Sequence, residues 1–169
     1  GKFPQGTLFE HVPVSQVALE HNFAESESTS EKCGNESTNE ECGNESAMVL
    51  NEDPLLDYLE DVKKVDTRGA YIVEYHASEL FPERWFDLVV VLRCEPTVLS
   101  KRLAKRNYSD KKVMENLECE MWNVCAEEAF AGFNKALVLE MHSANLQQME
   151  ANHDQLVAMV EHWCKLKGL

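Results

Sequence analysis

The segment AYIVEYHASELFPERWFDLVVVLR occupies residues 70–93 and contains two short apolar runs rich in β-branched residues, at 71–73 and 88–92. Runs of this length are too short for independent helices, so they predict two buried parallel strands that are apolar on both faces. Glu74 and His76 lie just past the first run. Open α/β sheets bind ligands at the carboxyl ends of their strands. The segment therefore predicts a site built on a parallel sheet.

The sequence before this segment predicts one more strand and two helices. Residues 11–14 are expected to end a strand, and Ser15 is expected to be the N-cap of a short helix that runs through Phe23. Leucines at helical spacing predict a second helix that begins at Pro54, because proline is favoured in the first helical turn.

The sequence after the segment continues the alternation of helices and strands. It predicts a helix at 98–106, one long helix at about 111–134, a strand at 136–139 and an amphipathic closing helix at 146–164. Met114, Leu117 and Met121 on the long helix are expected to be core contacts. Strands that alternate with helices predict an α/β fold with a parallel sheet.

Composition places the chain among ordinary globular proteins. Its 169 residues are enough for one domain with a core, and its hydrophobic and charged contents of 44% and 27% are typical values. No apolar run approaches the ~20 residues of a membrane-spanning helix, so no membrane association is expected. The six cysteines form no CxxC pair and follow no secretory leader, which favours reduced thiols in a cytosolic or nuclear protein.

The net charge of −14 is unevenly distributed. Residues 25–61 contain twelve acidic side chains and one lysine. Such a charge repels a nucleic-acid backbone, so no direct nucleic-acid binding is expected, and it suits a basic protein partner. The alternative interpretation is a solvated acidic loop without a partner. Within residues 24–46 the sequence CGNES occurs twice, which indicates a local duplication in a disordered loop.

Four side chains are candidates for chemistry. The Glu74 carboxylate could hold a metal-bound water or act as a general base, and His76 could transfer a proton near neutral pH. Arg102 and Arg106 lie four residues apart on one helix and would neutralise phosphate oxygens during phosphoryl transfer. The alternatives are that the arginines form a solvated face and that Glu74 only ends a strand. A third interpretation is a metal-dependent hydrolase that uses Glu74 and His76, but the sequence offers no further metal ligands for it.

Three segments resemble a known family: IVEYHASELFPERWFDLVVVLR at 72–93, KRLAKRNYSDKKVMENLECEMWNV at 101–124 and LEMHSANLQQMEANHDQLVAMVEHW at 139–163. The family is adenylate kinase isoenzyme six, also called the coilin-interacting nuclear ATPase protein. The resemblance implies the α/β fold of P-loop nucleoside monophosphate kinases, with helices on both faces of a parallel sheet. It also implies a single domain over residues 1–169, an acidic insertion at 24–50 in the monophosphate-binding arm, and a short lid at 105–115.

The resemblance implies catalytic roles for Glu74, His76 and Arg102, and Glu74 also matches the Walker B acid that serves Mg²⁺. Arg106 would contact the ATP phosphates.

Three residues of the expected arm helix would bind the monophosphate: Val14, Ser15 and Ala18. Family members transfer phosphate from ATP to AMP and related monophosphates with Mg²⁺, and they hydrolyse ATP. They also bind a basic ribosomal protein of the small subunit and assist rRNA processing and small-subunit maturation. A monomer in the nucleus and cytoplasm is expected.

The sequence also departs from the family. A P-loop reads GxxxxGK[ST], and only Gly1 and Lys2 could be its remnant, followed by Phe3 where a hydroxyl is required. In this family the strand before the P-loop lies in the middle of the sheet, so the strands at 71–73 and 88–92 are expected to lose a partner. Leu19 replaces the arginine expected to hold the monophosphate.

Two hypotheses follow from these departures. The sequence is either an incomplete version of an active kinase/ATPase, whose true N-terminus supplies the strand and the P-loop, or a degenerate paralogue that only binds proteins. The missing strand and the missing initiator methionine favour the first hypothesis. Leu19, which lies inside the sequence, favours the second.

Overall fold

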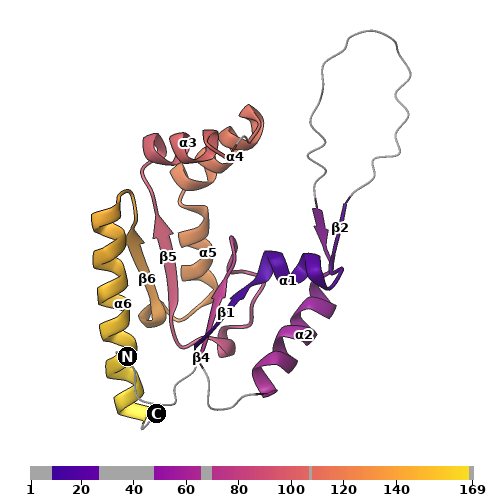
Figure 1. Ribbon diagram of the computed structural model, residues 1–169, viewed down its shortest axis with the longest axis vertical. Helices are drawn as coiled ribbons and strands as arrows, with labels where there is room; N and C mark the ends of the chain where they lie inside the picture. Colours follow the sequence, from indigo (N-terminus) through magenta and orange to yellow (C-terminus); the bar gives the residue numbers. More distant parts are fainter. Residues whose placement is uncertain (1–8, 27–47, 66–69, 107, 168–169) are drawn as a thin grey trace. The chain divides into compact units, whose positions relative to one another are not determined.

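The computed structural model describes residues 9–26, 48–65, 70–106 and 108–167 (Figure 1). The chain forms two compact units that meet in sequence between Tyr75 and His76. The duplicated part of the acidic segment and the expected P-loop remnant lie outside the described residues, so the expectations for them stay predictions. The expectation of one domain also stays a prediction.

The first unit combines parallel and antiparallel strand pairs with two helices. Its elements are β1 (Phe9–Pro13), α1 (Val14–Glu20), β2 (Ala24–Ser26), β3 (Met48–Leu50), α2 (Glu52–Val65) and β4 (Ala70–Glu74). Strands β1 and β4 are parallel, in a register from Phe9 opposite Ala70 to Pro13 opposite Glu74. Strands β2 and β3 are antiparallel and lie on either side of residues 27–47 in the sequence. The strand end expected at 11–14 is confirmed for residues 11–13, whereas Val14 begins α1.

A small apolar core holds the helices of this unit. The side chains of Val14 and Leu55 are fully buried, and Ala18 and Leu59 lie one turn further along α1 and α2 with exposures of 2% and 4%. Helix α1 starts at Val14 after Pro13, so the prediction that Ser15 is its N-cap is wrong. Proline precedes the helix in an extended conformation, with φ −78° and ψ 96°.

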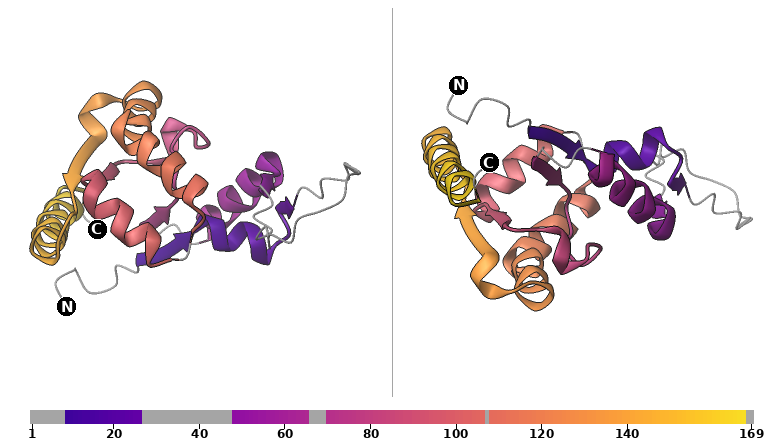
Figure 2. Two further views of the ribbon diagram at one scale, coloured as in Figure 1. Left: turned by 90° about the horizontal axis from the view of Figure 1, so that it is seen from above. Right: turned by 90° about the horizontal axis from the view of Figure 1, so that it is seen from below.

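The second unit is a parallel strand pair with helices around it. Its elements are η1 (Glu83–Trp85), β5 (Val89–Arg93), α3 (Pro96–Ala104), α4 (Asp110–Met121), α5 (Val124–Gly132), η2 (Lys135–Leu137), β6 (Val138–His142) and α6 (Leu146–Lys167). Val89 lies opposite Val138 and Arg93 opposite His142. Helices α5 and α6 lie on either side of this pair (Figure 2). Val91, Ala126 and Ala129 form its core.

The predicted α/β class is confirmed, but the burial of the strands is not. Ile72 on β4 is 55% exposed and Leu92 on β5 is 60% exposed, so the prediction that both strands are buried on both faces is wrong. In the described ranges β4 pairs only with β1, and β5 pairs only with β6. Each of the two strands thus has one neighbour in the described ranges, which agrees with the expectation that each lacks a second one.

The predicted long helix is interrupted. Asn123 adopts a left-handed conformation with φ 56° and separates α4 from α5. A residue in the left-handed conformation cannot continue a right-handed α-helix, so α4 ends before Asn123 and α5 begins after it. The last strand also begins two residues later than expected, because residues 135–137 form the short helix η2. None of the described helices is long and apolar enough to cross a membrane.

Candidate functional site

Glu74 ends β4 at the carboxyl edge of the first unit's parallel pair. Its Oε2 atom lies 2.9 Å from Nε2 of His11, and the two form a hydrogen bond between side chains that are 72% and 56% exposed. Residues two apart on a strand face the same side, so Glu74 shares a face with Ile72, which lies opposite His11 in the register. The carboxylate is therefore positioned by a neighbouring strand while it remains open to water.

His11 was not predicted as a site residue. The sequence signals a strand around residues 11–14, but it does not give the register of that strand against β4. Only the register shows that the His11 side chain reaches Glu74 rather than a residue one step away, since a shift of one position moves a side chain to the other face.

The three residues expected to bind the monophosphate lie on opposite faces of α1. Val14 and Ala18 are buried in the core of the first unit, with exposures of 0% and 2%. Ser15 is exposed, and Leu19, one turn further along, is 55% exposed on the same face. A buried aliphatic side chain cannot hydrogen-bond to a phosphate. The open face of α1 therefore presents one hydroxyl, and the position expected for arginine presents an apolar side chain.

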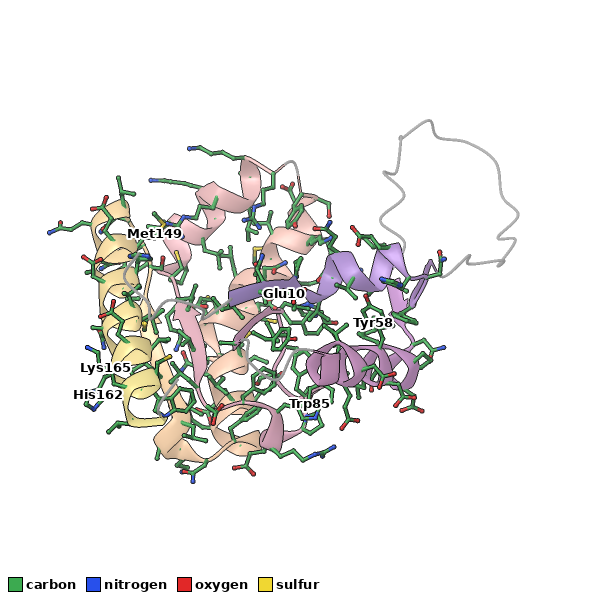
Figure 3. The ribbon with its side chains drawn as sticks, turned by 60° about the horizontal axis from the view of Figure 1, so that its bottom comes forward. Glu10, Tyr58, Trp85, Met149, His162 and Lys165 are labelled. Atoms are coloured by element: carbon green, nitrogen blue, oxygen red, sulfur yellow. The ribbon has the colours of Figure 1, made fainter. Side chains whose placement is uncertain are left out.

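An aromatic cluster follows α1 and was not predicted. The His21 ring lies 4.2 Å from that of Tyr58, and Phe23 lies 5.8 Å from both. Figure 3 shows Tyr58 projecting from α2 toward α1. Ring pairs at 4.5–7 Å add to stability beyond their buried area. The cluster packs the segment between α1 and β2 against α2.

In the second unit, Arg102 projects from α3 onto the turn between β6 and α6. Its guanidinium donates hydrogen bonds to the carbonyl oxygens of Ser143 at 2.8 Å and Ala144 at 3.0 Å. It also lies 3.5 Å from Sγ of Cys94. These contacts give Arg102 a role in closing the turn, and its catalytic role stays a prediction.

Arg106 and the expected lid follow α3. The Arg106 side chain is exposed, and its backbone N–H donates to the carbonyl of Leu103 at 2.9 Å. Ser109 caps α4 by accepting a hydrogen bond from the N–H of Lys112. The Lys112 ammonium lies 4.6 Å from the centre of the Tyr108 ring, a cation–π contact. The predicted lid, residues 105–115, thus corresponds to the α3–α4 connection and the start of α4.

Arg93, which ends β5, is the centre of a polar network in the second unit. Its Nε donates to Oε1 of Glu120 at 2.8 Å, its Nη1 donates to Oε2 of Glu140 at 2.9 Å, and its Nη2 donates to the Glu120 carbonyl and the Asn123 side chain. The backbone N–H of Cys94 donates to the same Glu120 oxygen. The hydrogen bond that Arg93 donates to the Glu120 carboxylate raises the pKa of Arg93. This network joins both strands to the α4–α5 junction.

Sequence reasoning missed this network because its partners lie 27, 30 and 47 residues away from Arg93 along the chain. One local signal was present. An arginine that directly ends an apolar strand brings its charge next to the core, so it requires acidic partners.

His76 begins the second unit and is exposed. The Sγ of Cys125 donates to its carbonyl oxygen at 3.4 Å. Burial raises the pKa of the Cys125 thiol, and the nearby carboxylate of Glu128 raises it further. The loop after β4 is therefore held to α5 by a neutral thiol.

Comparison with known proteins identifies the family. Residues 4–123 match the family described as an AAA domain. The chain is 39% identical over 153 residues to an adenylate kinase isoenzyme 6 homolog of Caenorhabditis elegans, which covers 90% of this chain and 80% of the worm protein. It is 39% identical over 163 residues to the homolog of Dictyostelium discoideum, with 96% and 83% covered. The chain belongs to the adenylate kinase isoenzyme 6 family.

The family resemblance inferred from the sequence is thus confirmed, including the α/β nucleotide-kinase type of fold. The Saccharomyces cerevisiae homolog is 38% identical over 115 residues, which cover 68% of this chain and 57% of the yeast protein. Membership in this adenylate kinase isoenzyme 6 family makes the chain a relative of nucleotide kinases.

The residues present fit Mg²⁺ in part. Mg²⁺ in kinases is held by one or two carboxylates together with phosphates and water, rather than by a protein cage. The exposed Glu74 carboxylate suits that arrangement. No group of three or more potential metal ligands occurs in the ranges that the structure describes. Gly1 and Lys2, the expected phosphate-binding residues, lie outside those ranges.

Proposed function

We propose that this protein is a nucleoside monophosphate kinase that converts ATP and AMP to two ADP molecules, hydrolyses ATP, and acts in maturation of the small ribosomal subunit in the nucleus and cytoplasm. The observation that carries the proposal is the position of Glu74 at the carboxyl end of a parallel strand, in a chain of this family. That edge is where α/β nucleotide-binding proteins hold the charged part of their ligand.

Two of the predicted residues, Glu74 and Arg106, have a defined part in this proposal. Glu74 would hold a water of the Mg²⁺ shell, with its orientation fixed by His11. The exposed Arg106 would approach the transferred phosphate, where positive charge stabilises the transition state. The metal ion, when bound with ATP, neutralises charge on the phosphate oxygens.

Two of the expected phosphate contacts do not fit the residues present. The 169 residues contain no GxxxxGK[ST] sequence, and Lys2 is followed by Phe3 rather than by a hydroxyl. Arg102 already donates to two carbonyl oxygens. If the 169 residues transfer phosphate, the remaining candidates for phosphate contacts are therefore Arg106, Gly1 and Lys2.

A second candidate function is protein binding without catalysis. The exposed Leu19 supports it, because the arm presents an apolar side chain where a monophosphate requires a cation. The partner would be a basic protein of the small ribosomal subunit, attracted by the acidic segment at 25–61.

A coupled-enzyme assay on the full chain separates the two functions. The kinase proposal expects AMP-dependent formation of ADP that falls at least tenfold in Arg106→Ala and Glu74→Gln, in line with the loss of one charge-stabilising group. Lys165→Ala is the matched control, because Lys165 is an exposed cation on α6, outside the expected lid.

Turnover that is absent from the wild-type chain, or equal in all four proteins, would rule out the kinase proposal for this polypeptide. The binding candidate predicts that deletion of residues 25–46 weakens retention of the purified basic ribosomal protein in a pull-down. Unchanged retention would exclude the acidic segment as its docking site.

A further inference from the structure

Helix α4 and its junction with α5 expose three large apolar side chains. The exposed fractions are 55% for Met114, 66% for Met121 and 77% for Trp122. Met114 and Met121 are seven residues apart, which is two helical turns, so they share one face of α4. Both were expected to be core contacts, and the structure places them in contact with water instead.

The orientation of α4 explains this exposure. Val113, Leu117 and Glu120 form its partly buried stripe, and α4 packs against α3. Glu120 is held by Arg93 through its carboxylate and its carbonyl oxygen. Because this contact fixes the rotation of the helix, the face that carries the methionines turns about 90° away from the buried stripe.

The junction that carries Trp122 is well ordered by hydrogen bonds. The N–H of Trp122 donates to the Glu118 carbonyl at 2.9 Å, and the N–H of Asn123 donates to the Glu120 carbonyl at 3.2 Å. The Asn123 side chain accepts a hydrogen bond from Arg93. Trp122 is thus presented by a fixed backbone, and a partner would not have to order it on binding.

The surroundings of the three apolar side chains are acidic. Glu115 and Glu118 are exposed on α4 beside them, and Glu127 is exposed on α5. Lys111 forms a 3.8 Å ion pair with Glu115, so its charge is offset within the helix. An apolar surface with an acidic rim disfavours nucleic acids and anionic membranes, since both carry negative charge.

We propose that Met114, Met121 and Trp122, the methionine–tryptophan surface, dock a helical protein segment with apolar anchors flanked by lysine or arginine. Methionine adapts to different partner shapes, and tryptophan is enriched among the residues that dominate binding energy. An amphipathic helix that places anchors at i, i+3, i+4 and i+7 matches the two-turn spacing of the methionines. The surface uses residues outside the acidic segment and outside the proposed nucleotide site, apart from Met114 in the expected lid.

The test measures binding of a defined peptide to the full chain by calorimetry. The probe is a 20-residue amphipathic peptide of leucine and lysine, and a leucine–glutamate peptide with the same apolar face is the charge control. We expect the lysine peptide to bind and the glutamate peptide not to bind. Trp122→Ala and Met121→Gln should weaken binding at least tenfold, the usual effect of losing a dominant interface residue.

Matched controls distinguish this surface from general attraction to an acidic protein. Met159→Gln and Leu166→Gln remove exposed apolar side chains from α6 and should leave binding unchanged. Deletion of residues 27–47 should also leave it unchanged. Circular dichroism verifies that each variant is folded.

Three outcomes would overturn the proposal. The first is equal weakening by the α4 and α6 variants, and the second is loss of binding on deletion of 27–47, which would assign binding to the acidic segment. The third is a dimer in sedimentation analysis that Trp122→Ala dissociates, which would make a second copy of the chain the occupant.

Discussion

Replacement of Arg93 by methionine tests whether the network at the end of β5 holds the second unit together. The change keeps an unbranched side chain and removes all five guanidinium donors. It leaves Glu120, Glu140 and Asn123 without their common partner. Because these residues come from β6 and from the α4–α5 junction, the loss affects both strands of the pair and that junction.

The size of the effect follows from burial. The side chains of Arg93 and Glu120 are 14% and 17% exposed, so this pair is largely shielded from water. The side chain of Glu140 is 37% exposed. Hydrogen bonds to charged groups contribute about 1.5–3 kcal/mol, and exposed ion pairs contribute about 0–1 kcal/mol. We therefore expect Arg93→Met to lower the free energy of unfolding by about 2–3 kcal/mol, nearly all of it from Glu120.

Urea denaturation followed by circular dichroism measures this loss, with Lys111→Met as the matched control. Lys111 and Glu115 are 87% and 60% exposed, so the control should cost no more than about 0.5 kcal/mol. A cycle of Arg93→Met with Glu120→Gln should give a coupling energy of about 1 kcal/mol or more. A loss from Arg93→Met as small as that from the control would refute the view that this network stabilises the unit.

Three further predictions concern single positions. Leu55→Ala removes a fully buried side chain and should cost about 2–5 kcal/mol in urea denaturation. Leu19→Ala removes a side chain that is 55% exposed and should cost less than about 0.5 kcal/mol, and similar losses for the two would contradict the assigned core. Asn123→Ala should have a free energy of unfolding about 1 kcal/mol lower than that of Asn123→Gly, because φ 56° strains alanine but not glycine, and equal stabilities would contradict the left-handed junction. Partial desolvation and the carboxylate of Glu128 raise the pKa of the exposed Cys125 thiol, so its alkylation by iodoacetamide should begin at a higher pH in the folded chain than in urea, as mass spectrometry would detect, and identical pH profiles would contradict the raised pKa.

The order of strands and helices could be predicted because it depends on local patterns. The β-branched runs at 71–73 and 88–92 became β4 and β5, and Pro54 lies in the first turn of α2. Both predicted strands are parallel to a neighbour. Their degree of burial could not be predicted in the same way, because it depends on which elements cover each face.

The break at Asn123 shows where local pattern fails. Residues 111–134 keep helical spacing on both sides of the junction, so no period change marks it. The left-handed residue is stabilised by its contact with Arg93, 30 residues earlier. The same long-range network rotates α4 and exposes Met114 and Met121. The prediction that Met114 and Met121 are core contacts was therefore wrong, because their exposure depends on contacts between residues far apart in the sequence.

The open edges of β4 and β5 in the described ranges and the lack of a GxxxxGK[ST] sequence in the 169 residues have one explanation. In P-loop proteins the loop follows a strand directly, so a sheet without that strand also lacks the loop. In the described part of the chain β4 and β5 each have a single neighbour, and the exposure of Ile72 and Leu92 agrees with strands that are incompletely covered. Each strand is five residues long, and short edges limit pairing with other chains. Hydrogen-exchange protection of the β5 N–H groups that face away from β6 and phosphate transfer should therefore occur together or not at all, because both require a further strand that ends in a phosphate-binding loop.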